Sequence, residues 1–335
     1  MKLNIFHIVA RSISYNLKSA VYQVSIILLL AAVITGSLMT GKSVRKSLRL
    51  TSFEKLGNTG ILISSGIRYF DPSLAGRISA ETGLKSTGLL ELDGYCQHFS
   101  SGQTAPRIKI YGIEDDFFAF QGNSELKVNK GEVAINERLA GYLGIKTGDE
   151  LIIRFNSISN IPADAPFSPG SDATASLVLK TGVILNSDNS GNFSLGISQI
   201  TPMNIFINCS DLVDAEGKIP EINRLLLENS RNTTVEVIYN KLRNVMKPED
   251  TGMTIRYVPE TNEYELISDR IFIDQPQVDE IKKMSIPSFP VITYLANSIT
   301  KGNRSAPYSF ISGLDPSLYE GVPEGNGIVI NKWLS

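Results

Sequence analysis

Residues 21–40 form one long, predominantly apolar run, whereas the apolar segments of the remaining chain are shorter and are separated by polar residues. The run reads VYQVSIILLLAAVITGSLMT and contains no charged residue. About 20 residues at a rise of about 1.5 Å each cross a hydrocarbon core of roughly 30 Å. The pattern therefore predicts one transmembrane helix over residues 21–41.

A second apolar pattern precedes this run. Apolar residues recur there at helical spacing among basic residues, at Phe6, Val9, Ile13 and Leu17. An amphipathic helix over residues 1–20 either lies on the cytoplasmic surface of a membrane or packs as an ordinary core helix. The pattern is typical of both.

A cleaved signal peptide is the nearest alternative to a retained transmembrane helix. The apolar run is longer than a signal-peptide core, and no A-x-A-like cleavage site closes it. A retained anchor is the better interpretation. Its orientation stays open, because basic residues flank the run on both sides. These residues are Lys2, Arg11, Lys18, Lys42, Arg45, Lys46 and Arg49.

The segment GSLMTGKS, residues 36–43, satisfies the phosphate-binding pattern G-x-x-x-x-G-K-[ST] through Gly36, Gly41, Lys42 and Ser43. A phosphate loop follows a short buried strand and is glycine-rich, so that its backbone N–H groups wrap the phosphates. Here a long apolar run precedes the segment, and bulky residues fill the loop. We interpret the match as fortuitous: the two glycines end the span, and Lys42 marks its water-facing edge.

Short strands and helices alternate after the run, with turn residues between them. Helices are expected over residues 45–56, 71–83 and 137–143, and after Pro220 and Thr233 or Thr234. Strands are expected over residues 61–64, 89–95, 107–111, 132–135, 150–155, 177–185, 203–207, 253–257, 264–267, 271–273, 291–295 and 308–311. The fold class is α+β, a mixed α/β domain over residues 42–335.

Two features organise this domain. Residues 156–176 are rich in Ser, Pro, Ala and Asp, which predicts a loop and an inserted subdomain over residues 155–290. The segments YGIEDD and GEVAIN, residues 111–116 and 131–136, resemble SGLDPS and GIVIN, residues 312–317 and 327–331. This echo predicts a pseudo-repeated strand-helix unit. The second copy stops at Ser335, where its helix should begin, so we expect a truncated domain.

Composition and charge limit the possible functions. The chain has 335 residues, a net charge of -2 and 42% hydrophobic residues. This composition is typical of a globular domain with a hydrophobic core. The chain lacks the excess of basic residues that is typical of nucleic-acid-binding proteins. Cys96 and Cys209 either pair in an oxidising compartment or are buried as free thiols.

Candidate chemistry is sparse. The chain has two histidines, so a metal centre or a Ser-His-Asp triad has little material. His98 is expected at a strand end. Four aspartates are expected in turns and at helix caps: Asp115, Asp116, Asp269 and Asp274. The aromatic residues Tyr69, Phe70, Phe117, Phe118 and Phe120 are expected in the core. The sequence predicts no catalytic, cofactor-binding or metal-binding residue and no cofactor.

The segments GKSVRKSL, EKLGNT and SGIRYFD, which begin at Gly41, Glu54 and Ser65, resemble the region after the first span of FtsX/MacB-like ABC transporter permeases. Residues 131–149 and 291–298 are similar to the periplasmic core domain of that family. The resemblance implies an inner-membrane subunit whose large domain lies in the periplasm.

In such permeases a cytoplasmic ABC ATPase subunit hydrolyses ATP, and the permease transmits the motion to the periplasm for efflux, export or lipoprotein release. The resemblance further implies a second permease copy, contact with membrane lipid, a periplasmic partner protein and no enzymatic activity in this chain. A single-span anchored binding or sensor protein is the alternative.

Overall fold

The computed structural model describes residues 5–66, 68–156, 174–196, 200–212, 221–230, 233–268, 273–284, 286–314, 323, 325 and 327–332. The chain divides into two compact units. The first comprises residues 1–158 and 172–247, and the second comprises residues 159–171 and 248–335. The predicted subdomain over residues 155–290 differs from this division, because three strands within that range belong to the sheet of the first unit.

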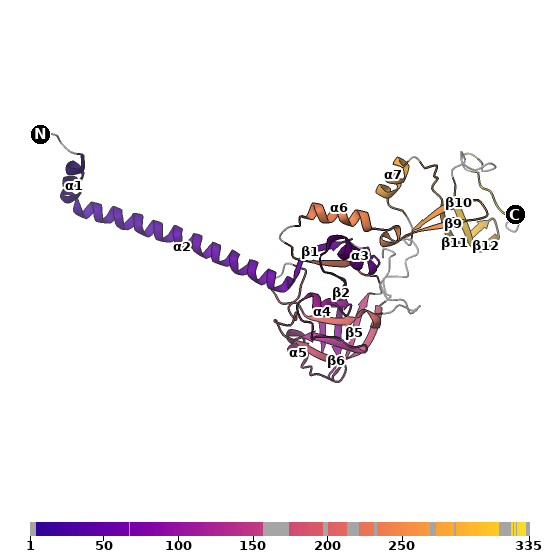
Figure 1. Ribbon diagram of the computed structural model, residues 1–335, viewed down its shortest axis with the longest axis horizontal. Helices are drawn as coiled ribbons and strands as arrows, with labels where there is room; N and C mark the ends of the chain where they lie inside the picture. Colours follow the sequence, from indigo (N-terminus) through magenta and orange to yellow (C-terminus); the bar gives the residue numbers. More distant parts are fainter. Residues whose placement is uncertain are drawn as a thin grey trace. The chain divides into compact units, whose positions relative to one another are not determined.

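Two helices open the first unit (Figure 1). Helix α1 covers Ile5–Tyr15, and helix α2 runs without interruption over 40 residues, Leu17–Leu56. Separate helices were expected over residues 21–41 and 45–56, whereas the structure has one helix that continues through Gly36 and Gly41. A glycine inside a helix costs only about 1 kcal/mol relative to alanine, and this segment contains no proline. The helix predicted over residues 45–56 is the last part of α2.

An eight-stranded sheet forms the body of the first unit. Its strands are β1 (Thr59–Ser64), β2 (Ser86–His98), β3 (Thr104–Ile113), β4 (Glu132–Asn136), β5 (Glu150–Asn156), β6 (Thr174–Leu185), β7 (Asn204–Asn208) and β8 (Arg224–Glu228). They follow the order β1-β8-β2-β3-β7-β4-β6-β5. Strand β2 also pairs with β5 through Gly94–His98, so the six strands from β2 to β5 close into a barrel.

Alternating apolar residues of all six strands fill the barrel. Leu151, Ile153 and Phe155 of β5 are buried at every second position, as expected when one face of a strand points into a core. Helix α5 (Glu137–Leu143) adds Leu139 and Leu143 to the same cluster. Its ends match the sequence: the Asn136 side chain caps the first turn and Gly144 ends the helix with a left-handed φ.

Two further apolar clusters lie outside the barrel. Helices α3 (Ser73–Thr82) and α6 (Val235–Val245) pack against β1 and β8 around Ile78, Leu225 and Ile238. A second cluster collects the aromatic residues between the barrel and the short helix α4 (Phe117–Phe120). Phe70, Phe117, Phe118 and Phe120 are buried, which confirms that these aromatics belong to the core.

The second unit contains two antiparallel hairpins and a helix. Strands β9 (Met253–Val258) and β10 (Glu263–Ser268) form one hairpin, and strands β11 (Ile292–Lys301) and β12 (Arg304–Gly313) form the other. Helix α7 (Gln275–Lys283) stands between them in the sequence.

The two similar sequence segments, residues 111–136 and 312–331, have similar structures only in their first parts. Strands β3 and β12 are each the second strand of an antiparallel hairpin and end within one position of each other in the two segments, at Ile113 and Gly313. The later half of the echo differs, because residues 132–136 form β4 whereas residues 327–331 form no strand.

Most other expected elements are confirmed within a few residues. The helix predicted after Pro220 is wrong: residues 224–228 form β8 between β1 and β2, and Pro220 lies outside the described residues. A short apolar run such as RLLLE suits a buried strand as well as a helix. The strand predicted at residues 271–273 falls mostly outside the described part of the chain.

Candidate functional site: the long helix and its attachment to the barrel

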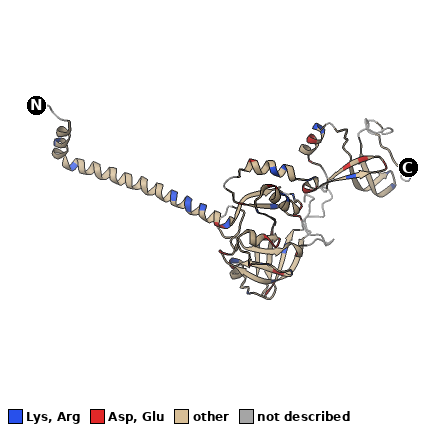
Figure 2. Ribbon diagram, viewed as in Figure 1, with Lys and Arg blue, Asp and Glu red and all other residues tan. Residues whose placement is uncertain are grey.

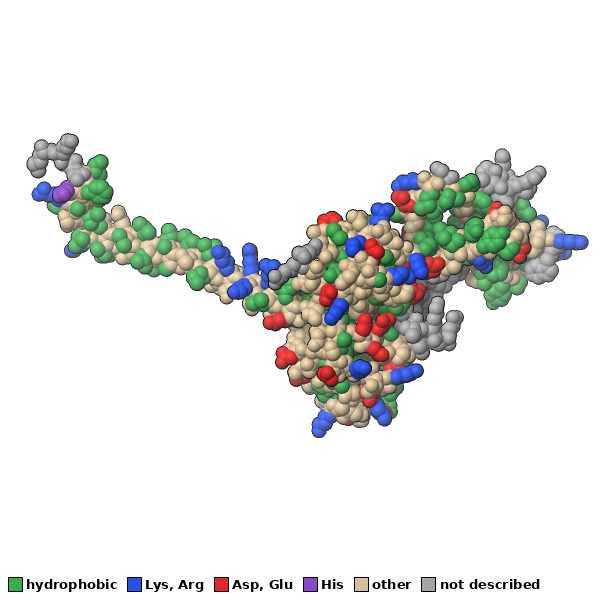
Figure 3. Space-filling model, viewed as in Figure 1, with side chains coloured by type: hydrophobic (Ala, Val, Ile, Leu, Met, Phe, Trp, Pro, Cys, Tyr) green, Lys and Arg blue, Asp and Glu red, His purple; other side chains and the backbone are tan. Residues whose placement is uncertain are grey.

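Helix α2 has the properties of a membrane-crossing helix. Among the helices that the structure describes, it is the one that is long and apolar enough to cross a membrane, and its apolar stretch is exposed (Figure 3). Its 40 residues correspond to about 60 Å, roughly twice the thickness of a hydrocarbon core. The apolar run accounts for about one half of that length, so α2 is longer than a hydrocarbon core requires.

The residues of the phosphate-binding pattern lie within α2. Gly36, Gly41, Lys42 and Ser43 are all helical, and the Thr40 hydroxyl donates to the Gly36 carbonyl at 2.9 Å. Backbone N–H groups inside a helix already bond to carbonyls four residues earlier. This segment therefore does not present the free N–H groups with which a phosphate loop binds nucleotides.

The end of α2 is anchored to the barrel by several contacts. Lys55 is 5% exposed, its carbonyl accepts from Ser194 N at 3.1 Å, and its ammonium donates to the Ile200 carbonyl at 3.4 Å. Gly57 then turns the chain with a φ of 57°. The next residue, Asn58, donates through its side chain to the Phe120 carbonyl at 2.9 Å. The helix end thus contacts both α4 and the segment after β6.

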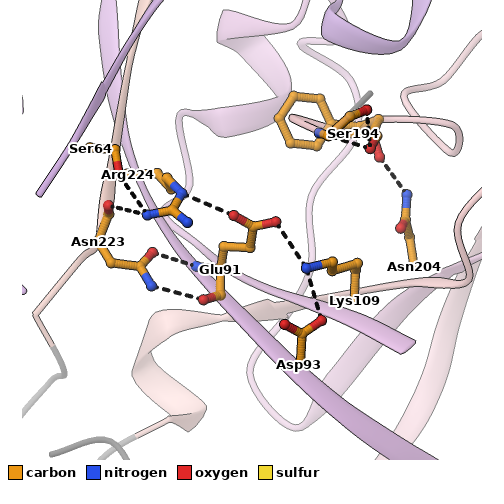
Figure 4. Close-up of polar contacts among 10 residues, drawn as sticks. Ser64, Glu91, Asp93, Lys109, Ser194, Asn204, Asn223 and Arg224 are labelled. Carbon is orange, nitrogen blue, oxygen red and sulfur yellow. Dashed lines mark hydrogen bonds and ion pairs between the residues drawn. The ribbon is translucent and has the colours of Figure 1, made fainter. Parts of the chain in front are cut away.

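These contacts attach α2 to a rigid aromatic cluster. The ring of Phe193 lies edge-to-face against Tyr111 and against Phe117, with centroid distances of 5.2 and 5.3 Å. Phe206 stacks on Tyr111 at 5.3 Å. The Asn204 side chain holds this segment by donating to the Phe193 carbonyl at 2.7 Å (Figure 4). Closely packed rings deform little, so a force on α2 acts on the barrel as a whole.

Strands β1 and β8 extend the sheet beyond the barrel, next to β2, and we call them the β1–β8 extension. A charged network connects this extension to the barrel (Figure 4). Glu91 on β2 pairs with Arg224 on β8 at 2.9 Å and with Lys109 on β3 at 3.3 Å, while Lys109 also reaches Asp93 at 2.8 Å. The side chain of Glu91 is 12% exposed and that of Asp93 is 81% exposed. Burial opposes the charge on Lys109, but the two carboxylates prevail and raise its pKa.

Sequence reasoning missed this network. Asp93 and Lys109 face each other across β2 and β3, a cross-strand charge pair that the pairing of the two predicted strands would have suggested. Arg224 lies on the strand that was predicted as a helix, so no pattern in the sequence indicated its position. The Asn223 side chain reinforces the junction through hydrogen bonds of 2.8 Å with both the N–H and the carbonyl of Glu91.

His98 lies at the end of β2, as predicted, beside a serine and an aspartate. The Ser101 hydroxyl is 3.0 Å from Nδ1, whereas the Asp149 carboxylate is 3.7 Å from Nε2. The second distance is too long for a hydrogen bond. The Ser101 hydroxyl also accepts from Gln103 N at 3.3 Å. These contacts close the β2–β3 turn and do not orient the imidazole as a general base.

The candidate aspartates Asp115, Asp116 and Asp274 lie in a turn or at the start of a helix, as predicted, but without side-chain cap hydrogen bonds at Asp116 and Asp274. Asp115 accepts from the Asn208 side chain at 2.9 Å, and Asp116 accepts from the Thr87 hydroxyl at 2.7 Å. Asp274 precedes the first turn of α7, and Asp269 lies outside the described residues. Within the described ranges, no three His, Cys, Asp or Glu side chains are arranged to hold a metal ion.

The two cysteines are separate in the structure. Cys96 and Cys209 are free, buried thiols, and burial raises the pKa of each to about 12. Of the two alternatives open from the sequence, the structure shows the buried thiols.

Solved structures with some similarity to the chain come from transport proteins. No family model matches the sequence, and no curated protein matches it either. The periplasmic region of MacB from Actinobacillus actinomycetemcomitans matches 70% of this chain and 97% of its own length, with 11% sequence identity and a TM-score of 0.38. The extracellular domain of the noncanonic ABC-type transporter YknZ from Gram-positive bacteria matches 63% of this chain and 100% of its own length, with 10% identity and a TM-score of 0.32.

Proposed function

We propose that this chain is a membrane subunit of an FtsX/MacB-type ABC transporter. Residues 1–20 form a surface helix on the cytoplasmic side, residues 21–41 form a membrane span, and residues 42–335 form a domain in the periplasm. A separate cytoplasmic ATPase hydrolyses ATP, and the chain transmits the resulting movement for export, efflux or lipoprotein release. The proposal rests on the sequence resemblance and on the geometry of α2.

The continuity of α2 from the apolar run to the barrel carries the proposal. A helix that enters a domain through a flexible linker tethers it and transmits no torque. Here one helix continues to Leu56, its end is buried at Lys55, and its contacts lead into the aromatic cluster. A tilt or rotation of the span therefore moves the barrel as a rigid body.

Affinity purification of the full chain from native membranes tests the partner. We expect an ABC-type ATPase subunit to copurify in stoichiometric amounts with two copies of this chain. A chain that purifies alone and without nucleotide-dependent movement would support the alternative, a single-span anchored binding or sensor protein.

A distance measurement tests the mechanical role. Because both native thiols are buried, a cysteine introduced at the exposed position Ser101 can be labelled selectively. We expect the distance between labels in two copies to change on addition of ATP and vanadate. Four Gly/Ser residues inserted after Arg49 should abolish this change but preserve ATP hydrolysis. A two-turn alanine insertion at the same place is the control, because it preserves a rigid connection.

Nucleotide binding to the purified chain itself would contradict our interpretation of residues 36–43. A phosphate-binding lysine would make this binding sensitive to Lys42→Ala. We expect no fluorescent ATP analogue to bind either the original chain or this variant at concentrations that saturate an ABC ATPase.

A further inference from the structure

Four basic residues follow the apolar run at short intervals along α2 (Figure 2). They are Lys42, Arg45, Lys46 and Arg49, and we call them the basic stripe. Successive residues of an α-helix are about 100° apart, so these positions fall within an arc of about 100° and extend over about 10 Å of helix. The stripe is thus a continuous positively charged surface two turns long.

No acidic residue compensates this charge locally. Residues 1–53 contain neither aspartate nor glutamate, and all four side chains of the stripe are exposed. Within the part of the chain that the structure describes, none of the four forms an ion pair. Like charges at positions three and four apart destabilise a helix, so the stripe suits an anionic partner that neutralises it.

The stripe faces away from the side on which α2 meets the barrel. Lys55, the buried contact, lies about 130° around the helix from the centre of the stripe. The guanidinium of Arg49 lies over the Phe53 ring, 5.4 Å from its centroid, which restrains the side chain while its N–H groups remain exposed in the guanidinium plane. Planar N–H donors of this kind bind phosphate oxygens.

The position of the stripe along the helix identifies its partner. The polar headgroup region extends about 5 to 8 Å beyond each side of the hydrocarbon core. Lys42 follows the last residues of the apolar run directly, so the first two turns after that run lie at the depth of the lipid phosphates. The long side chains of Lys and Arg reach the remaining distance.

We propose that the basic stripe binds the headgroups of anionic phospholipids, in the membrane leaflet next to the barrel domain. This proposal rests on the proposed membrane span. Each Lys or Arg near an anionic surface increases binding roughly fivefold. The bound phosphates hold α2 at one depth and restrict its rotation, which favours transmission of movement to the barrel over sliding in the bilayer.

Lipid binding by the purified full chain tests the proposal. Native mass spectrometry in detergent, with phosphatidylglycerol or phosphatidylcholine added, reports the preference for the anionic lipid. The test variant is Lys42→Gln, Arg45→Gln, Lys46→Gln and Arg49→Gln combined. We expect its preference for phosphatidylglycerol over phosphatidylcholine to be at least tenfold lower than that of the original chain. High salt should weaken the preference of the original chain, because salt screens exposed charges.

A matched variant controls for net charge. Arg107→Gln, Lys130→Gln, Lys146→Gln and Lys180→Gln remove the same charge from exposed positions of the barrel, and we expect the lipid preference to persist. Circular dichroism checks that both variants retain their helix content. An equal loss in both variants would overturn the proposal, as would competition by inorganic phosphate at the same concentration, which would indicate a general anion site.

Two further results separate this proposal from the proposed function. Alkaline extraction of membranes tests the span itself: a chain that is released has no span, and both proposals fail. A chain that stays in the membrane without preferring phosphatidylglycerol refutes only lipid binding by the stripe. An unchanged lipid preference together with loss of the second copy or the ATPase would assign the stripe to a protein interface.

Discussion

The buried pair between Glu91 and Arg224 provides the most direct test of the junction between the barrel and the β1–β8 extension. Arg224→Met removes the 2.9 Å ion pair with Glu91 and the 2.9 Å hydrogen bond to the Ser64 hydroxyl. Methionine keeps most of the side-chain volume, so the change is mainly electrostatic. It leaves the 12% exposed carboxylate with Lys109 as its remaining ion-pair partner.

The magnitude follows from burial. Removing one partner of a fully buried charge pair costs about 3 to 5 kcal/mol. Arg224 is 22% exposed and Lys109 still pairs with Glu91, which lowers the expected loss to about 2 to 3 kcal/mol. For a domain of this size each kcal/mol corresponds to about 2 to 4 °C in Tm. We therefore expect Tm to fall by about 5 to 10 °C.

Thermal unfolding of the full chain in detergent measures this effect. Near-UV circular dichroism is the appropriate signal, because it reports the packed aromatic cluster and not the long helix, which detergent stabilises. Asp93→Asn is the control: its carboxylate is 81% exposed, so we expect a Tm change below about 2 °C.

A double variant completes the test. Glu91→Gln combined with Arg224→Met removes both charges and should be more stable than the sum of the two single losses predicts, because no uncompensated carboxylate stays buried. Equal Tm values for Arg224→Met and Asp93→Asn, or strict additivity in the double variant, would refute the reasoning.

Three further predictions concern other parts of the first unit. Gly94→Ala should destabilise the barrel by about 1 to 3 kcal/mol, because an added Cβ would lie 2.4 Å from a backbone carbonyl oxygen of β5. Gly141→Ala, where no atom lies within 4 Å, should leave denaturant stability unchanged or raise it. Cys96 and Cys209 should react with a maleimide only after the chain is unfolded, and this reaction should not require a reductant. Labelling of the folded chain, or a requirement for reductant, would contradict the assignment of both residues as buried free thiols. Burial and the neighbouring carboxylates of Asp116, Asp115 and Asp71 raise the pKa of Glu114, so the folded state binds this proton more tightly than the unfolded state. Stability from this group is present below the unfolded pKa of about 4.5 and is lost as pH rises through the higher folded pKa. Glu114→Gln should therefore raise Tm at pH 7 and have little effect or lower it at pH 4, and an equal shift at both pH values would show that the charge is irrelevant.

The expected elements with strong local signals are present in the structure. Residues 71–83 are an example: Asp71 accepts from Ser73 N at 2.7 Å, and Gly83 ends α3 with a left-handed φ of 73°. The turn and cap chemistry of such residues acts over a few positions, so a linear reading detects it. The same holds for β5, whose alternating pattern is local.

Strand β8 shows where local patterns fail. Its run RLLLE is compatible with a helix or a strand, and the choice depends on pairing with β1 and β2, which are more than a hundred residues away. The continuity of α2 was missed for a related reason. Separate helices were expected over residues 21–41 and 45–56, but a glycine inside a helix costs only about 1 kcal/mol relative to alanine, so Gly36 and Gly41 do not interrupt it.

The sequence by itself determined the exposed apolar run, the basic residues that follow it, and most strand and helix positions, because these depend on composition and short periodicity. Only the tertiary structure decided that β2 closes a barrel by pairing with β5 and that Glu91 meets Arg224. It also decided that Lys55 is buried against the segment after β6. Each of these contacts joins residues distant in the chain, and their free energy comes from burial and pairing that no local pattern encodes.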